Sequence, residues 1–227
     1  QCNAMGTREA GGTRSLPGYR RYDLADDRVE LAGLWGVPTE EIPVESGWAY
    51  PDIIDGIIDR KIRGLWIIAT NPTVSFPNRA LLEEAMARLD LLVVQDGYET
   101  PTTALAHVVL PAAIWGEKEG TYTNSERRVS RVRKAVEPPG EAKTDFDIFM
   151  LMAEKLGQRD RLYSGWETPE DAFNEWRRVS SGRLCDYGGI SYDRVDLAGG
   201  VQWPCPEGTR ELEGTPSLYT DGIFPTE

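Results

Sequence analysis

The chain has 227 residues, of which 40% are hydrophobic and 27% are charged, a balance that predicts a folded globular protein rather than a disordered one. Its formal net charge of -12 disfavours binding to nucleic acid or anionic lipid, because the average surface repels both. Apolar runs such as LWIIA at 65–69 are far shorter than the roughly 20 residues that cross a bilayer. We therefore expect no nucleic-acid partner and no membrane span.

Both ends of the sequence are typical of the interior of a longer chain. The opening residues QCNAMGTREAGGTRSLPGY (1–19) are rich in glycine and polar residues and are typical of a loop. The last residues, GTPSLYTDGIFPTE (214–227), are rich in turn signals and strand-like. We therefore expect these residues to be a piece of a larger polypeptide, with the rest of that polypeptide as a partner.

From residue 51 onward the chain alternates helix and strand signals. Apolar residues at helical spacing, or a Pro in the first turn, predict helices at PDIIDGIIDRKI (51–62), PNRALLEEAMARL (77–89) and TPTTALA (100–106). Apolar runs rich in β-forming residues predict buried strands at GLWIIAT (64–70), LLVVQD (91–96) and HVVLP (107–111). This alternation predicts an α/β fold with a parallel, Rossmann-like sheet, flanking helices and right-handed crossovers.

The pattern changes after Pro111. Short extended segments are predicted at GTYTN (120–124) and RVSRVRKAVEP (128–138), and helices with clear start and stop signals at TDFDIFMLMAEKLG (144–157) and TPEDAFNEWRRVSSG (168–182). Residues 183–227 carry Gly and Pro at short intervals without a lasting period, so we expect loops and small strands there. The parallel sheet is thus followed by a loop-rich α+β segment.

Polar residues stand where the predicted strands end, which is where parallel sheets bind ligands. Asn71 follows the first strand, Gln95 and Asp96 end the second, and Thr100 comes next. These side chains can hydrogen-bond a base edge and ribose hydroxyls. The third strand leads into a loop that carries Lys118. The strand ends lack the G-x-G-x-x-G of a dinucleotide site, and no P-loop motif occurs, so both of those nucleotide sites are disfavoured.

A basic cluster stands out in so acidic a chain. It comprises Arg127, Arg128, Arg131, Arg133 and Lys134. Because the cluster follows a glycine-bearing loop after the third strand, it is a candidate for binding an anion or cofactor. The alternative is that these cations pair with the chain's own surplus carboxylates on a solvated surface. The sequence leaves both interpretations open.

The cysteines and the histidine do not form a metal motif. The spacing of the three cysteines, Cys2, Cys185 and Cys205, forms no C-x-x-C motif, and His107 is the single histidine. We expect ordinary thiols of a reducing compartment, and hence a cytoplasmic location. His107, at the start of a buried strand, is expected to be a satisfied core histidine.

Other candidates also have structural alternatives. Asp145 can contact a ligand or simply cap the helix that follows. Glu117 and Glu119 can act as an acid/base pair or as ordinary surface carboxylates. The seven tryptophans are expected to lie mostly in the core. Taken from the residues alone, the chain is a scaffold that holds a cofactor without its reactive centre.

Five stretches together carry a family resemblance: QCNAMG (1–6), IIATNPTVSFPN (67–78), LLVVQDGYETPTTALAHVVLPAAIWGEKEGTYTNSERR (91–128), KAVEPPGEAKTDFDIF (134–149) and GGVQWPCPEGT (199–209). They resemble the molybdopterin oxidoreductase family that carries a bis(molybdopterin guanine dinucleotide) cofactor, with molybdenum bound by the pterins. Within this family the chain looks most like the assimilatory nitrate reductase branch, with formate dehydrogenase α subunits close behind. Ser130, Phe146 and His107 depart from residues common in the family.

The resemblance implies a much longer chain, with an N-terminal [4Fe-4S] cluster, a cysteine or selenocysteine on molybdenum and a C-terminal β-barrel, which these residues do not include. It implies that residues 1–116 and 143–163 form part of a cofactor-binding α/β domain, and that 117–142 and 164–227 pack near the iron-sulfur domain. Position by position, it puts cofactor contacts at Gln1, Asn71, Gln95, Asp96, Thr100, Lys118, Gly120 and Asp145.

The leading functional hypothesis is therefore a fragment of a molybdenum oxidoreductase, inactive alone. Intact, it would take electrons from a redox donor protein or subunit and reduce a small anionic substrate, nitrate, to nitrite. One alternative is a formate dehydrogenase α subunit. A noncatalytic iron-sulfur subunit like that of respiratory complex I, or a generic nucleotide-binding α/β module, are the others.

Overall fold

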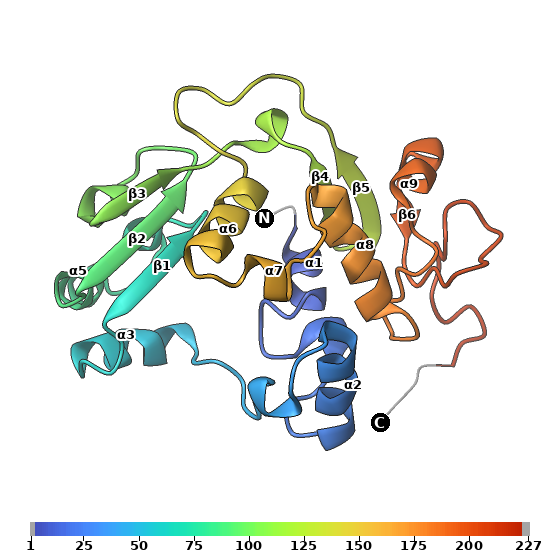
Figure 1. Ribbon diagram of the computed structural model, residues 1–227, viewed down its shortest axis with the longest axis horizontal. Coiled ribbons are helices and arrows are strands. Elements are labelled where there is room, and N and C mark those ends of the chain that lie inside the picture. Colours follow the sequence, from blue (N-terminus) through green and yellow to red (C-terminus); the bar gives the residue numbers. More distant parts are fainter. Residues whose placement is uncertain (1–2, 224–227) are drawn as a thin grey trace. The chain divides into compact units, whose positions relative to one another are not determined.

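The computed structural model describes residues 3–223, which form two compact units (Figure 1). We name each unit after its sheet. The parallel-sheet unit comprises residues 48–118 and 134–161, and the antiparallel-sheet unit comprises 3–47, 119–133 and 162–223. No helix within residues 3–223 has both the length and the apolar character that crossing a membrane requires.

The parallel sheet confirms the three predicted strands, although the third is not buried as expected, since Val108 and Val109 are 42% and 46% exposed. It contains β1 (Gly64–Ile68), β2 (Leu91–Asp96) and β3 (Val108–Pro111), in the order β1-β2-β3. Both pairs are parallel, and the register sets Ile68 of β1 beside Gln95 and Pro111 of β3 beside Asp96. The three strands therefore end at one edge of the sheet, as the positions of the polar residues led us to expect.

Helices cover both faces of this sheet. Three helices do so, namely α3 (Tyr50–Ile58), α5 (Arg79–Ala87) and α6 (Asp145–Lys155). Because alternate residues of a strand point to opposite faces, Leu92 and Val94 pack with α3 and α5, while Gln95 faces α6. On the α6 side the rings of Trp66 and Phe149 lie 5.6 Å apart. Leu92 and Val94 are fully buried, and each contributes roughly 1.5–3 kcal/mol by that burial.

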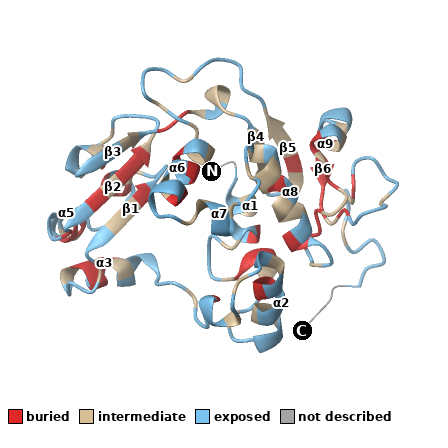
Figure 2. Ribbon diagram, viewed as in Figure 1, coloured by how far each residue is buried: buried red, intermediate tan, exposed pale blue. Residues whose placement is uncertain are grey.

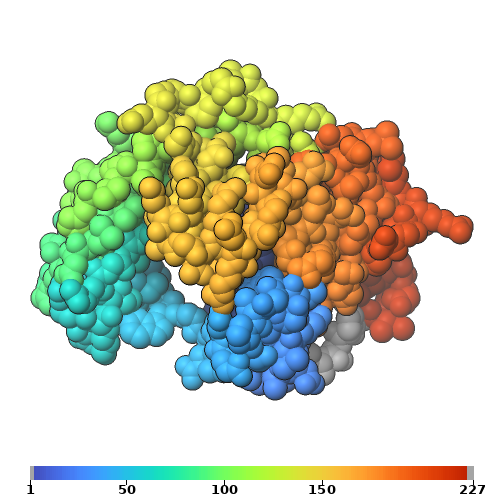
Figure 3. Space-filling view, viewed as in Figure 1, coloured from blue at the N-terminus to red at the C-terminus, as the bar shows by residue number. Residues whose placement is uncertain are grey.

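Figure 2 shows this buried stripe in red along β2. In the space-filling view, the teal-to-green surface of residues 48–118 is continuous and packed (Figure 3). The remaining short elements of the unit are α4 (Pro72–Ser75), η3 (Thr103–Leu105) and η4 (Trp115–Glu117). A further short helix, α7 (Arg159–Leu162), follows α6.

Two helix predictions in this unit need correction. α3 ends at Ile58 rather than at Ile62, because the chain turns at Arg60, whose φ is +62°. The predicted helix at 100–106 is wrong in kind, since only the short 3-10 helix η3 forms. The predicted start is present, because the side chains of Thr100 and Thr103 accept from each other's backbone N–H groups, at 3.2 and 2.8 Å, as in a capping box. The helix stops after one turn because the chain is already extended at Ala106, where ψ is 143°, before β3 begins at Val108.

The antiparallel-sheet unit contains β4 (Gly120–Thr123), β5 (Arg128–Val132) and β6 (Val201–Gln202), in the order β4-β5-β6. Its helices are α1 (Ala4–Glu9), α2 (Ala25–Trp35), α8 (Pro169–Ser180) and α9 (Tyr192–Ala198), with short 3-10 turns η1 (Pro17–Tyr19) and η2 (Thr39–Glu41). The extended segments expected near 120 and 128 and the helix expected from 168 are thus confirmed.

An ion pair between a buried arginine, Arg20, and an exposed glutamate, Glu30, connects three elements of this unit. The Arg20 side chain is fully buried and donates two hydrogen bonds, at 3.0 and 2.7 Å, to the Glu30 carboxylate. Its remaining donor reaches the carbonyls of Pro17 and Val179 at 2.9 and 3.0 Å. Arg20 therefore joins η1, α2 and α8, and its planar fork is suited to such bidentate pairing.

Two helices of this unit lie where the sequence predicted loops. α1 forms within the opening residues, although no side-chain hydrogen bond caps it. α9 interrupts the predicted loop-rich tail, and its signals were present: Ser191 caps the start by accepting from Arg194 N at 3.1 Å, and Gly199 ends it in the left-handed region. We infer that contacts of Glu9, described below, stabilise α1.

The compact units group the chain differently from the predicted domains in two respects. Residues 117–118 and 134–142 belong to the parallel-sheet unit, whereas the sequence grouped them with 164–227. Residues 3–47 belong to the antiparallel-sheet unit, whereas the sequence grouped them with the parallel sheet. Their buried residues Leu16 and Leu31 pack with Val179 of α8, which explains the grouping. The assignment of the segments to a cofactor domain and to the neighbourhood of an iron-sulfur domain stays a prediction.

Candidate functional site

The centre of the candidate site is a chain of three polar side chains at the ends of the parallel strands. Gln95 of β2 donates through Nε2 to Oδ1 of Asp145 at 2.7 Å. Lys118 forms an ion pair with the other oxygen of Asp145, Oδ2. Gln95 is fully buried, whereas the side chains of Lys118 and Asp145 are 30% and 31% exposed. The set therefore runs from the interior of the sheet to its surface.

The start of α6 explains why Asp145 can take part. Thr144, not Asp145, caps this helix, because its hydroxyl accepts from Asp147 N at 3.1 Å. Asp145 is the first helical residue, and its carboxylate is left to pair with Lys118 and Gln95. A carboxylate in the first turn also interacts favourably with the helix dipole.

Lys118 and Asp145 face a hollow of about 360 Å³ that opens at the strand ends. Asp96 lines the same hollow, and its Oδ1 accepts from Tyr98 N at 3.1 Å. Two strongly exposed aromatic side chains, Tyr98 and Trp115, complete its polar and aromatic lining, with exposed fractions of 67% and 76%. The hollow thus combines a carboxylate, an ion-paired ammonium and aromatic rings.

A second hollow, of about 700 Å³, shares the Asp96–Tyr98 turn with the first. Asp96, Glu99, Thr100 and Thr103 supply its polar groups, and β3 supplies an apolar wall through Val109. Asp96 therefore borders both hollows. The paired arrangement offers carboxylate acceptors on one side and a cation on the other.

Asn71 lies in a separate network of the same unit. Its Oδ1 accepts from the hydroxyls of Thr73 and Thr102, at 2.9 and 2.7 Å. Both threonines are buried, and their hydroxyls are also 2.9 Å from each other. Asn71 therefore joins the turn that follows β1 to the turn that precedes β3.

The structure brings together part of the predicted site. Asp96, Lys118 and Asp145 share the smaller hollow, and Asp96 and Thr100 share the larger one. Gln95 lies behind Asp145 without exposed surface. Gly120 begins β4 in the antiparallel-sheet unit. Asn71 lines neither hollow, and Gln1 lies outside the described residues.

Tyr98 and Trp115 were missed by the sequence analysis. Their signal was an aromatic residue in each loop that follows a strand. The expectation of tryptophans mostly in the core is wrong, because Trp35, Trp48 and Trp115 are exposed and Trp203 alone among the described tryptophans falls in the buried class. An aromatic residue in a loop beside polar strand ends therefore favours a ligand contact over a core position.

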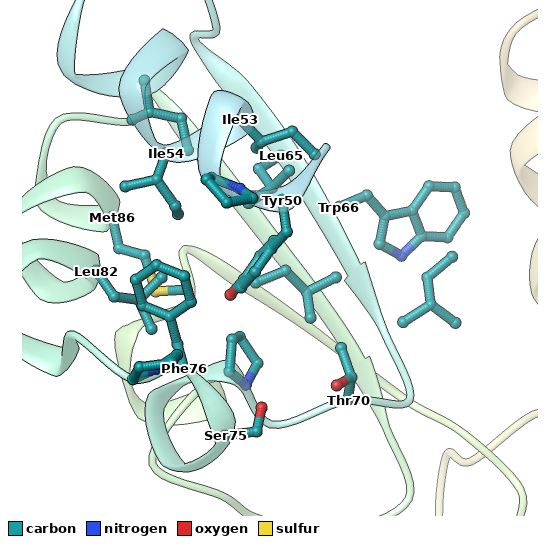
Figure 4. Close-up of a pocket in the computed structure, with 16 residues that line it drawn as sticks. Tyr50, Ile53, Ile54, Leu65, Trp66, Thr70, Ser75, Phe76, Leu82 and Met86 are labelled. Atoms are coloured by element: carbon teal, nitrogen blue, oxygen red, sulfur yellow. The ribbon is translucent and has the colours of Figure 1, made fainter. Parts of the chain in front are cut away.

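A third hollow in this unit has a different character. It measures about 620 Å³ and lies between β1, α3 and α5 (Figure 4). The rings of Tyr50 and Phe76 meet edge to face in it, with centroids 4.9 Å apart, and Trp66 points away from them. Its lining is mainly apolar, with the hydroxyls of Thr70 and Ser75 at one end. Without converging charges it offers less chemistry than the strand-end hollows.

The basic cluster is used within the chain, which supports the alternative of internal pairing. Arg127 donates to backbone carbonyls, including that of Thr215 at 3.1 Å, and Arg128 pairs with Glu126. The Arg131 guanidinium lies over the Tyr192 ring, with its central carbon 3.4 Å from the ring centroid. Arg133 pairs with Asp196, and Lys134 pairs with Glu137. Only Lys118 among the singled-out cations lines one of these hollows.

His107 and Glu117 also have structural roles. His107 is exposed, not buried as expected, yet its Nδ1 accepts from Leu92 N at 2.8 Å. Glu117 accepts from Ile114 N at 2.9 Å through Oε2. His107 thus bonds the backbone of β2, and Glu117 bonds that of the loop after β3. Within residues 3–223, no three His, Cys, Asp or Glu side chains gather in a way that could hold a metal ion.

A buried polar cluster in the antiparallel-sheet unit was also missed. Glu9 of α1 is fully buried, and its carboxylate accepts from Trp203 Nε1 at 2.7 Å and from the Tyr187 hydroxyl. The Tyr187 oxygen also lies 2.7 Å from the hydroxyl of Thr123. Burial raises the pKa of Glu9, although both hydrogen bonds lower it, and burial beside Glu9 raises the pKa of Tyr187 well above its usual value. Burial likewise raises the pKa of Cys185 to about 12.

Known proteins resemble the chain over its whole length. It is 39% identical over 231 residues to nitrate reductase of Synechocystis sp., covering 100% of this chain and 32% of the relative. It is 41% identical to the assimilatory nitrate reductase catalytic subunit of Bacillus subtilis, covering 98% and 31%. It is 40% identical to the F420-dependent formate dehydrogenase subunit alpha of Methanocaldococcus jannaschii, covering 100% and 33%. The chain thus spans about a third of the length of these relatives.

The fold is also that of a solved structure. Acetylene hydratase from Pelobacter acetylenicus matches with a TM-score of 0.56 at 20% identity, over 83% of this chain and 25% of that one. This likeness confirms the mixed α/β fold with its parallel sheet. Residues 4–155, which include the strand ends and both polar hollows, match the molybdopterin oxidoreductase family. The chain therefore belongs to the molybdopterin oxidoreductase family.

Proposed function

We propose that the two strand-end hollows bind one guanine nucleotide arm of a bis(molybdopterin guanine dinucleotide) cofactor. The observation that carries this proposal is the position of Asp96, which borders both hollows, with the Lys118 ammonium on one side of it. A guanine base offers N–H donors on its Watson–Crick edge, and a carboxylate accepts from them. The diphosphate that follows the nucleoside is anionic and suits an ammonium partner.

The side chains present fit such a group. Asp96 and Glu99 supply acceptors, and the hydroxyls of Thr100 and Thr103 supply both donors and acceptors. Tyr98 and Trp115 are exposed beside Asp96, where a purine can stack on an aromatic face. When bound, the metal-pterin group supplies two-electron redox chemistry. The residues described here bind and orient its nucleotide end.

For the whole protein we propose an oxidoreductase that reduces nitrate to nitrite. The support is the identity of 39% and 41% to nitrate reductases along the whole chain. This proposal includes a [4Fe-4S] cluster and a redox donor outside these residues, a cytoplasmic location, and no activity for residues 1–227 alone. Formate oxidation is the second candidate, because the identity to a formate dehydrogenase subunit alpha is 40%.

Asp96→Ala tests the nucleotide site in the full-length protein. The variant removes an acceptor for ligand donors that binding would bury, at a cost of about 1–3 kcal/mol, so we expect cofactor retention to fall about tenfold. Molybdenum is measured by elemental analysis, and guanine nucleotide is measured after denaturation. Asp59→Ala is the matched control, because Asp59 pairs with Lys61 on the exposed surface of the same unit. Unchanged molybdenum and guanine content in Asp96→Ala would remove Asp96 from the site.

The substrate is tested separately on the full-length protein. Reduction of nitrate with an artificial electron donor is expected, and oxidation of formate with an artificial acceptor is not. The opposite result would favour the formate dehydrogenase alternative. Absence of both molybdenum and guanine nucleotide would favour a noncatalytic subunit.

A further inference from the structure

The depth of Gln95 is the starting observation. The resemblance to the family implies that Gln95 contacts the cofactor, but its side chain has no exposed surface and lines neither polar hollow. Its Nε2 is committed to Asp145 Oδ1 at 2.7 Å. A ligand in the smaller hollow therefore meets Lys118 and Asp145, which line it, whereas Gln95 lies behind Asp145.

Asp145 connects the buried amide to the surface cation. One carboxylate oxygen accepts from Gln95 and the other pairs with Lys118, so each partner fixes a different oxygen. Free rotation of the carboxylate would weaken the ion pair, since the direction of Oδ2 sets where the ammonium lies. A half-exposed ion pair held by itself contributes little, whereas a fixed partner reduces the entropy lost on forming it.

We propose that Gln95 is a positioning residue, which fixes the Asp145 carboxylate so that Asp145 aims the Lys118 ammonium into the smaller hollow. Lys118 is then the side chain that meets the anionic part of the ligand, and Gln95 acts on the ligand only through this pair. The identity of that ligand as a guanine dinucleotide rests on the proposed function. The orientation of Lys118 is a property of this chain with or without the ligand.

The Gln95 amide has a second, unused group. Its Oε1 is buried and has no hydrogen-bond partner among the described residues. An amide kept in the middle strand with one side unsatisfied costs free energy compared with an apolar residue there. The hydrogen bond that Gln95 donates to Asp145 is the interaction that offsets this cost.

The test measures how well Lys118 is held, with no need of bound cofactor. Full-length protein purified without cofactor is treated briefly with an amine-acetylating reagent, and modification of Lys118 is quantified by mass spectrometry. Lys61 is the internal reference, because its side chain is 64% exposed and its partner Asp59 lies far from Gln95 in sequence. We expect Gln95→Met to raise the Lys118 rate, relative to Lys61, by about 2- to 10-fold.

Asp145→Asn supplies the second arm of a double-mutant cycle. It should raise Lys118 modification at least as much as Gln95→Met, and the double variant should add nothing to Asp145→Asn alone. A purely structural role for Gln95 would make the two effects multiply. Multiplying effects, or a wild-type rate in Gln95→Met, would overturn the proposal.

Two further measurements keep the outcomes separable. If Gln95→Met does not fold, Gln95→Asn carries the same expectation, because its shorter amide cannot span the 2.7 Å contact to Asp145. Binding of GDP to the same protein preparations tests the proposed function independently. Absence of GDP binding with the expected Lys118 response would reject the nucleotide site and support the positioning role. GDP binding with an unchanged Lys118 modification rate in Gln95→Met would support the nucleotide site and reject the positioning role.

Discussion

Two carboxylates of this protein, Asp145 in the parallel-sheet unit and Glu9 in the antiparallel-sheet unit, show opposite uses of one functional group. Each accepts hydrogen bonds on both oxygens. Asp145 is 31% exposed and has an ammonium partner, whereas Glu9 is fully buried and accepts from two neutral donors, Tyr187 and Trp203. The first is balanced in charge and open to a ligand, and the second is closed off from one.

The difference teaches how surroundings decide the role of a carboxylate. Burial without a cation disfavours the charged form, which is why the pKa of Glu9 is raised, and removal of its hydrogen bonds would leave buried donors unsatisfied. Glu9 is therefore expected to matter for folding. Asp145 keeps solvent and Lys118 beside it, so it is expected to matter for binding. The predictions below separate these two expectations.

Glu9→Ala should have the largest effect. It removes the acceptor for Tyr187 and Trp203 together and leaves a cavity, so we expect the free energy of unfolding to fall by about 3–5 kcal/mol. Thermal or denaturant unfolding of the full-length protein measures the loss. Glu40→Ala, in the exposed turn η2, is the control and should stay within about 0.5 kcal/mol of wild type. Equal stability of the two variants would remove the proposed structural role of Glu9.

Asp145→Ala should lower cofactor retention much more than it lowers the stability of the fold. The fold should lose only about 1 kcal/mol, since the carboxylate is partly exposed and Thr144 still caps α6. Cofactor retention, measured as molybdenum and guanine content of the full-length protein, should fall several-fold, because Lys118 loses the carboxylate that positions its ammonium. A large drop in melting temperature with full cofactor content would reverse the comparison between Asp145 and Glu9.

Tyr187→Phe should have a moderate effect on folding. It removes the hydrogen bond to Glu9 and the contact with Thr123 while it keeps the ring, so we expect a loss of about 1–2 kcal/mol in the free energy of unfolding. The pKa of Glu9 should rise further, because this hydrogen bond is one of the two that lower it. A stability equal to wild type would show that Trp203 alone satisfies the carboxylate.

Glu9→Gln should have the smallest effect at neutral pH and should show best in the pH dependence. The folded pKa of Glu9 lies above its unfolded value of 4.5, so the stability contributed by Glu9 is full below the unfolded pKa and is lost as pH rises through the folded pKa. Glutamine does not titrate and keeps the shape. Unfolding measured from acid to neutral pH should therefore lose this decline in Glu9→Gln. A profile in Glu9→Gln equal to that of the wild type would mean that the pKa of Glu9 is the same in the folded and the unfolded protein.

Local patterns predicted the parallel-sheet unit well. Its strands are short apolar runs, and these runs form strands even where they stay partly exposed, as Val108 and Val109 of β3 do. The polar residues Asp96 and Thr100 also lie beside hollows as expected. In parallel sheets the carboxyl ends of the strands commonly border such hollows, whatever the rest of the fold. The helix predicted from residue 100 has the predicted start, but it stops after one turn because the chain is extended again at Ala106, just before β3, which a helix-start signal does not reveal.

The sequence by itself determined the three parallel strands, the polar residues at their ends and the family to which they belong. Tertiary structure alone decided what those residues do. Gln95 and Asp145 are 50 positions apart, and Glu9 and Tyr187 are 178 apart, so no local pattern shows that one pair reaches a surface hollow while the other lies in a core. Burial and charge partners are set by packing between distant segments, and they turn a carboxylate into either a binding group or a structural one.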